Sequence, residues 1–200
     1  RLRLADSYYA IKRYSAAIRQ YDRIEGDQQD YAPFQKGQAQ GQTGRNRAAI
    51  RTLEELIDEF ELSEWREEAL YSIGYLFLLE GEHEEAVSRF ETLVSRFNAH
   101  PLAAKAQYGI GDSYYNRSMW EEAVNAYRNG LIRFPNSPYV VDAVAHIDAT
   151  EHNASMRAKR IIDQVLRRSG GSTHGSGGSV VASAERLPHQ PSAVPSRRSR

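Results

Sequence analysis

The sequence predicts an all-α fold, an α-solenoid of about four to five antiparallel helix pairs. Three observations lead to this prediction. Residues recur at a fixed step along the chain, apolar residues within each unit follow helical spacing, and short polar breaks divide each unit in two. A period of a few tens of residues is typical of repeat architectures, in which each unit buries its apolar face against its neighbours.

Four columns of residues repeat with a step of 37, one of glycine, one of phenylalanine and two of alanine. Their members are Gly37, Gly74 and Gly111; Phe60, Phe97 and Phe134; Ala49, Ala86 and Ala123; and Ala69, Ala106 and Ala143. Four columns in one register are very improbable by chance, so the chain repeats one structural unit. The small residues mark close helix contacts, because a larger side chain would push the backbones apart.

Each unit has apolar residues at the spacing of two helices. In the fourth unit, Tyr108 and Gly111 share one face of a first helix, and Ala123 and Tyr127 share one face of a second. Polar breaks containing Gly or Ser separate the two helices, and glycine suits the positive φ often needed at a helix end. The predicted helix pairs lie near residues 1–26, 29–60, 64–97, 101–134 and 138–168.

The joints between units are rich in helix-capping residues. In RFPNSPYVVDA, residues 133–143, the first proline cannot continue the preceding helix because it has no N–H to donate. Asn136 or Ser137 can cap the next helix, with Pro138 in its first turn. At an earlier joint that lacks prolines, Ser63 is the predicted cap.

The first and last units depart from the pattern. The step from the first unit to the second is 32 rather than 37. In the fifth unit Asp148 replaces the glycine, and Ala158 follows ten residues later where twelve are expected. A terminal repeat has one uncovered face and is commonly atypical, so we expect the last helix to act as a polar cap.

The pattern resembles the tetratricopeptide repeat (TPR): a Gly with a Tyr three residues on, an Ala with an aromatic residue four residues on, and a following Pro. Gly111 and Tyr114, Ala123 and Tyr127, and Pro135 carry it. The usual TPR period is about 34 residues. The longer step here resembles TPR proteins of bacterial envelopes, namely outer-membrane assembly lipoproteins and the periplasmic coordinator of the Tol-Pal system. The resemblance implies a periplasmic location, or the periplasmic face of the outer membrane.

The resemblance also implies a concave groove that binds a protein or peptide ligand. In TPR proteins the first helix of each unit lines this groove, at fixed positions around the packing glycine. The groove residues expected here are Tyr9, Gln38, Tyr75, Leu78, Asp112 and Tyr115. Tyrosine combines a large contact area with a polar tip and is favoured at protein interfaces. At a third groove position, Phe34, Tyr71 and Tyr108 fit either the groove or packing between units.

Composition argues against several other functions. The 26 basic residues balance 26 acidic ones, so no positive field favours nucleic acid. Cysteine is absent and the six histidines form no ligand cluster, so we expect no metal and no cofactor. The chain has no phosphate-binding loop or serine-nucleophile motif, so we expect it not to be an enzyme. No apolar run approaches the roughly 20 residues of a membrane span.

The composition changes after residue 168, which predicts a helical repeat domain at 1–168 and a disordered tail at 169–200. Residues 170–200 contain five Gly, seven Ser and three Pro, too little apolar surface to offset chain entropy. The tail fits a native disordered segment, an engineered linker with a peptide, or out-of-frame translation. Because the chain begins at Arg1, we expect a fragment or a mature form.

The function predicted is that of a non-catalytic scaffold for protein–protein interaction. Two alternatives remain open: a purely structural segment of a longer repeat protein, and an accessory domain of an enzyme whose catalytic part lies outside this chain.

Overall fold

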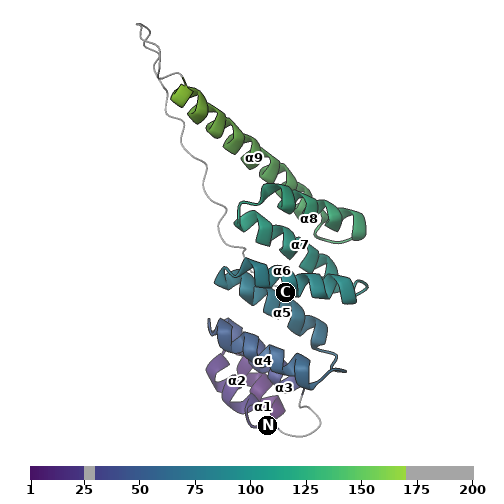
Figure 1. Cartoon of the computed structure of the whole chain (residues 1–200). Coiled ribbons are helices and arrows are strands. Elements are labelled where there is room, and N and C mark those ends of the chain that lie inside the picture. Colours follow the sequence, from purple (N-terminus) through teal and green to yellow (C-terminus); the bar gives the residue numbers. More distant parts are fainter. Residues whose placement is uncertain (25–29, 170–200) are drawn as a thin grey trace. The chain divides into compact units, whose positions relative to one another are not determined.

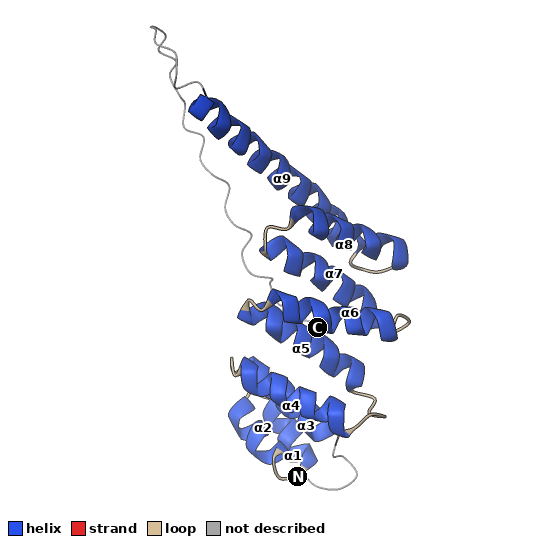
Figure 2. Ribbon diagram, in the orientation of Figure 1, coloured by secondary structure: helices blue, strands red, loops and turns tan. Residues whose placement is uncertain are grey.

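The computed structural model describes residues 1–24 and 30–169, and the regular elements in these ranges are all helices (Figures 1 and 2). The helices follow one another as α1 (Leu2–Ala10), α2 (Tyr14–Tyr21), α3 (Tyr31–Gln42), α4 (Asn46–Glu59), α5 (Arg66–Glu80), α6 (His83–Arg96), α7 (Pro101–Asn116), α8 (Trp120–Arg133) and α9 (Val140–Ser169). The all-α prediction is confirmed. The tail predicted at 169–200 lies outside the described residues except for Ser169, and it stays a prediction.

The first eight helices form four pairs, and each helix from α1 to α8 packs on the next one along the chain (Figure 1). The first helices also contact one another, because α3 touches α5 and α5 touches α7. The first helices therefore form one layer of the stack within the unit Arg1–Ile161, and the second helices form the other. This is the arrangement that the repeated sequence predicts.

A residue with positive φ lies in the turn between the two helices of every pair. These residues are Lys12, Gly44, Gly81 and Ser118, with φ of 60°, 73°, 78° and 59°. They follow the repeat step of 32, 37 and 37 residues, so the left-handed conformation that ends the first helix recurs with the sequence.

The fifth predicted helix pair is wrong, because residues Val140–Ser169 form one continuous helix, α9. The next position in the turn column is Ser155, which lies within α9. Neither Gly nor Pro occurs between Val140 and Ser169, so neither of the two strongest helix-breaking residue types interrupts the helix. The two residues missing between Asp148 and Ala158 are explained in the same way, since a continuous helix needs no residues for a turn.

The prediction that Ser63 caps the next helix is wrong, because the N-cap of α5 is Trp65; Ser63 and Ser137 both lie in the turns that precede α5 and α9. Ser63 Oγ accepts a hydrogen bond from the backbone N–H of Trp65 at 3.1 Å, and Ser137 Oγ accepts one from Tyr139 at 3.2 Å. Both serines thus stabilise the turn that leads into α5 or α9. At α7 the cap is His100, whose side chain accepts from Leu102 N.

Packing glycines hold the two helices of the second, third and fourth pairs close together. A Cβ added at Gly37 would lie 2.7 Å from Leu53, and one at Gly74 would lie 2.6 Å from the Phe90 ring. Gly111 faces Tyr127 in the same way. The largest core cluster runs from α3 to α8, and smaller clusters lie in the first pair and between α7, α8 and α9.

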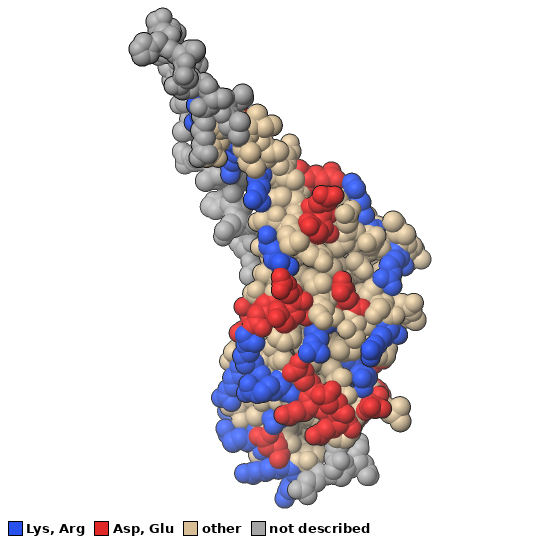
Figure 3. All heavy atoms as spheres, in the orientation of Figure 1, with Lys and Arg blue, Asp and Glu red and all other residues tan. Residues whose placement is uncertain are grey.

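Ion pairs link successive units at the surface. Arg89 reaches Glu54 at 2.6 Å, and Arg117 reaches Glu84 at 2.7 Å. Figure 3 shows acidic and basic side chains interspersed on the face that it draws, as the balanced composition suggests. Such exposed pairs contribute little individually to the stability of the fold.

Candidate binding face

The candidate binding face is the exposed side of the first helices, α1, α3, α5 and α7. All six residues predicted for it lie on these helices, because they follow the packing residue of each unit by one or four positions. Each of these side chains also has a defined environment within the protein, which decides what it can offer to a ligand.

Asp112 on α7 lies at the centre of a polar cluster. Tyr127 of α8 donates its hydroxyl proton to Asp112 Oδ1 at 2.7 Å. His146 Nδ1 of α9 lies 3.2 Å from the same hydroxyl and 3.5 Å from the carboxylate. Burial raises the pKa of Asp112 above its ordinary value, while the hydrogen bond from Tyr127 and the nearby His146 act in the opposite direction. Asp112 is therefore engaged by its own chain.

Three tyrosine rings surround the His146 side chain. The ring centroids of Tyr108, Tyr127 and Tyr115 lie 5.2, 5.4 and 6.2 Å from that of His146. Burial raises the pKa of the Tyr108 hydroxyl. His146 of α9 thus packs among three aromatic rings that α7 and α8 contribute.

Tyr115 is held from two sides. Its ring packs edge-on against Trp120 with centroids 5.2 Å apart, and its hydroxyl accepts a hydrogen bond from Asn153 Nδ2 of α9 at 3.1 Å. This side chain is half-buried, so part of its predicted contact area already serves the packing of α9.

Tyr75 on α5 is exposed and stands beside a second tyrosine. Its ring is nearly parallel to that of Tyr71, at 6.4 Å between centroids. Lys105 Nζ of α7 lies 4.5 Å from the centre of the Tyr71 ring, and burial lowers the pKa of this lysine. Leu78, one turn after Tyr75, is half-buried and packs against the central core. Tyr75 is therefore the predicted residue that is most available to a ligand.

Gln38 on α3 ties two units together, since its Nε2 donates to Ser72 Oγ of α5 at 2.7 Å. Phe34, one turn earlier, is buried and stacks on Trp65 at 4.9 Å. Of the two alternatives for Phe34, packing between units is the one that the structure supports.

Tyr9 on α1 belongs to a separate cluster. Its ring meets Tyr14 edge-on at 5.3 Å, and burial raises the pKa of its hydroxyl. Nearby, Asp6 accepts hydrogen bonds from Tyr21 at 2.7 Å and from Tyr31 at 3.3 Å. The first and fourth units thus each contain a Tyr–Asp hydrogen bond between their own two helices.

Sequence reasoning missed the contribution of α9 to this face. His146 and Asn153 approach Asp112 and Tyr115, and neither was predicted. A signal was present, because His146 follows Gly109 by one repeat step and thus places a large polar side chain in a glycine position.

No group of three or more His, Cys, Asp or Glu side chains within residues 1–24 and 30–169 could hold a metal ion. Within the same ranges, no helix has both the length and the apolar character that crossing a membrane requires.

The stacked helix pairs, the packing glycines and the layer of first helices define a TPR-type solenoid. The chain belongs to the YfiO family of outer membrane lipoproteins, which matches residues 26–156. The description of this family agrees with the bacterial-envelope resemblance of the sequence.

Solved structures show the same fold at low sequence identity. MamA 41-end from Desulfovibrio magneticus RS-1 is 19% identical, with a TM-score of 0.58 over 84% of this chain and 97% of that one. YrrB, a TPR protein with an unusual peptide-binding site, is 20% identical, with a TM-score of 0.56 over 70% and 71%. Kinesin light chain TPR-like repeats from Podosopora anserina are 14% identical, with a TM-score of 0.61 over 86% and 95%. No curated protein matches the chain.

Proposed function

We propose that this protein is a non-catalytic scaffold that binds a protein or peptide along the candidate binding face, in the bacterial periplasm at the outer membrane. The observation that carries the proposal is the exposed Tyr75 beside Tyr71, with Lys105 over the second ring. Membership of an outer membrane lipoprotein family and the peptide-binding site named for YrrB support it.

The chemistry of the face suggests how a ligand is recognised. Tyr75 offers an aromatic surface for an apolar side chain of the ligand. Lys105, half-buried next to Tyr71, offers a positive charge to a carboxylate or a backbone carbonyl. Asp112 contributes negative charge, but Tyr127 already donates to its carboxylate, so any attraction of Asp112 for a basic residue of the ligand is secondary.

A structural segment of a longer repeat protein is the second candidate function. The observation in its favour is the exposed apolar surface of α9, where Val141 is 76% and Val144 44% exposed. In a solenoid, each helix pair covers the apolar face of its neighbour, so a further unit would cover these side chains.

Photo-crosslinking tests the binding proposal. We expect a benzoylphenylalanine at position 75 to give a discrete adduct with a protein of the envelope in living bacteria. A matched probe at Glu55, an exposed position on α4 of the other layer, should give none. Tyr75→Ala should weaken the affinity for the protein so identified about tenfold, since aromatic anchors dominate many interfaces. Equal adducts at both positions, or an unchanged affinity, would show that this face is not the binding site.

A further inference from the structure

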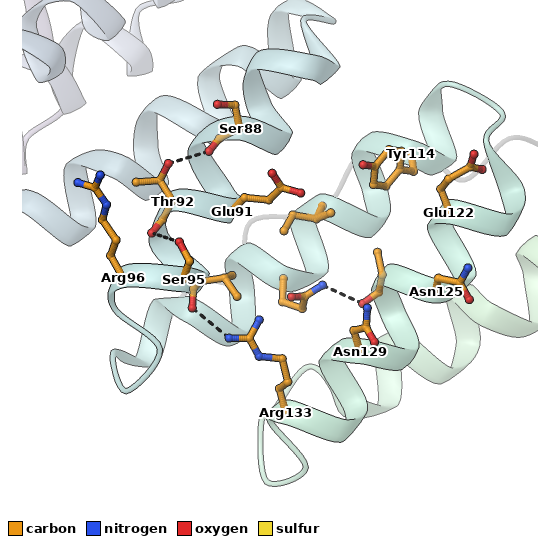
Figure 4. Close-up of a pocket in the computed structure, with 14 residues that line it drawn as sticks. Ser88, Glu91, Thr92, Ser95, Arg96, Tyr114, Glu122, Asn125, Asn129 and Arg133 are labelled. Carbon is orange, nitrogen blue, oxygen red and sulfur yellow. Dashed lines mark hydrogen bonds between the residues drawn. The ribbon is translucent and has the colours of Figure 1, made fainter.

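A polar groove lies between α6 and α8, on the layer formed by the second helices. Its volume is about 830 Å³, and it is lined by residues of α6, α7 and α8 (Figure 4). Both α6 and α8 pack on α7, which forms the floor between them. None of the residues predicted for binding lines this groove, so it is a separate feature from the candidate binding face.

The equivalent space one unit earlier, between α4 and α6, shows which side chain can fill such a groove. Between α4 and α6, the Arg89 guanidinium reaches from α6 to Glu54 of α4, with Nη2 and Oε1 2.6 Å apart. This side chain therefore spans the gap between successive second helices. It supplies a positive charge and several N–H donors to the space above α5.

One repeat step later, the acidic member of this pair is kept and the basic member is lost. Glu91 follows Glu54 by 37 residues, and Ala126 follows Arg89 by 37. Ala126 is buried against the groove, where it leaves room for an arginine side chain. Glu91 lines the groove and is exposed, and it makes no ion pair among the residues that the structure describes.

The rest of the lining suits a guanidinium and a polypeptide backbone. Ser88 and Thr92 of α6 and Asn125 and Asn129 of α8 line the groove, so hydroxyl groups border one side and amide groups the other (Figure 4). The floor includes the buried Gln107, whose Nε2 donates to the Ala126 carbonyl at 3.0 Å. The preceding unit has Leu70 at the position of Gln107, so the floor becomes polar at the same step at which the arginine is lost.

The charges at the two ends of the groove limit the ligand further. Glu122 lies in the first turn of α8, while Arg96 and Arg133 lie in the last turns of α6 and α8. Arg133 also donates to the Val94 carbonyl at 3.1 Å, which closes that end of the groove. A ligand with several positive charges would be repelled there, so a single arginine among uncharged residues fits best.

We infer that this groove binds an arginine side chain on an extended segment of a partner protein, which places its guanidinium on Glu91 as Arg89 does on Glu54. The partner thus supplies in trans the ion pair that the preceding unit makes within the chain. Arginine is favoured over lysine because Arg89 makes this contact in the preceding unit and because a guanidinium carries several N–H donors in a rigid, planar fork. The inference is independent of the binding proposed for the first helices.

A defined peptide tests this site in the full chain. The probe is acetyl-Gly-Ser-Arg-Ser-Gly-amide, and binding is followed by amide chemical-shift titration. We expect saturable shifts along residues 88–95 and 125–133, and weaker binding of the lysine analogue. Glu91→Gln should weaken binding about fivefold, the size expected for loss of one partly exposed ion pair. The matched control Glu85→Gln removes the same charge on the same helix outside the groove and should leave binding unchanged.

Two further variants exchange the residue types at the equivalent positions 89 and 126. Ala126→Arg should abolish peptide binding, because the new guanidinium occupies the groove and pairs with Glu91. Arg89→Ala should create a second binding site beside Glu54, seen as new shifts along α4 and α6. The inference is overturned by the absence of saturable shifts in the groove, or by equal affinity of wild type and Glu91→Gln.

The chain's own terminal arginines are a second source of the same side chain. Arg197, Arg198 and Arg200 are replaced together by Gln in the full chain, which leaves the groove itself unaltered. If the partner is a separate protein, this variant should bind the probe with the affinity of the wild type. A clear gain in affinity would overturn the assignment to a partner, because it would mean that the chain's own arginines compete for the groove.

Discussion

Two junctions in this solenoid use the same position of the repeat in different ways. In the apolar junction, formed by Phe90 with Gly74 and Gly109, both glycines leave space for the aromatic ring. In the polar junction, formed by Tyr127 with Gly111, Asp112 and His146, the second glycine is replaced by histidine and the ring carries a hydroxyl. The apolar junction is held by packing of the Phe90 ring, whereas the polar junction also depends on hydrogen bonds and on charge.

The difference between glycine and histidine at this position distinguishes an internal contact of the solenoid from the contact with the last helix. Glycine on both sides of Phe90 lets α7 approach α6 as closely as α5 does. At the polar junction, His146 stands one repeat step after Gly109 and contacts Tyr127 and Asp112. In place of the second glycine contact, α9 is thus attached at this position by polar contacts.

The largest effect is expected from Phe90→Ala, which removes the ring that fills the apolar junction. Phe90 is 1% exposed, and a buried Phe→Ala change costs about 3–5 kcal/mol through lost burial and the cavity left behind. The free energy of unfolding, measured by chemical denaturation, should fall by that amount. Tyr75→Ala is the matched control, since its ring is 43% exposed and its removal should cost far less. Equal losses would mean that Phe90 is not the centre of the junction.

Overpacking of the two junctions should have a smaller effect. Ala86 and Ala123 are fully buried at equivalent positions, beside the apolar junction and the polar junction respectively. Ala86→Leu and Ala123→Leu should each destabilise the protein by about 1–3 kcal/mol, because extra methyl groups force neighbouring side chains apart. Thermal melts measure this. Unchanged melting temperatures for both variants would show that these columns are not tight helix contacts.

Much of this fold could be predicted from the sequence because the repeat compares the chain with itself. The columns of Gly37 and Ala49 located the helix contacts, and the polar breaks located the turns, including the one at Ser118. The single helix α9 was missed because its residues follow the pattern of a unit until Asp148, and because Ser155 occupies the turn position that Ser118 occupies in the preceding unit.

The candidate site was harder to predict than the fold. Position relative to the packing glycine identified the exposed Tyr75, but it could not show that Asp112 is engaged by Tyr127 or that Tyr115 is engaged by Asn153. Those contacts depend on which side chains the neighbouring helices present, and the atypical α9 supplies one of them. The groove beside Glu91 was not predicted for the same reason. It was found by comparison with the preceding unit, where the Arg89 side chain spans the equivalent space.

Loss of the hydroxyl in the polar junction should cost less than the loss of a ring. Tyr127→Phe keeps the shape of the junction but removes the donor to Asp112, and loss of a hydrogen bond to this half-buried carboxylate costs about 1–2 kcal/mol. Denaturation should show this loss at neutral pH. Phe90→Tyr is the reciprocal variant, and it should also destabilise because the apolar junction offers its hydroxyl no acceptor. A neutral effect of Tyr127→Phe would show that the hydrogen bond contributes nothing to stability.

The smallest expected effect is a dependence on pH that only the polar junction shows. The pKa of Asp112 is raised above its ordinary value of 3.8, chiefly because burial disfavours the carboxylate. Folding therefore favours the protonated form, so this contribution to stability is complete below the ordinary pKa and is lost as the pH rises through the raised pKa. Asp112→Asn cannot ionise and lacks this loss. We expect the variant to gain stability relative to the wild type as the pH rises from about 4 to about 7, as measured by denaturation at each pH. Asp148→Asn, at an exposed position on α9, provides the control for a change of net charge. If the stability of Asp112→Asn relative to the wild type stays constant or falls as the pH rises, Tyr127 and His146 outweigh burial at this carboxylate.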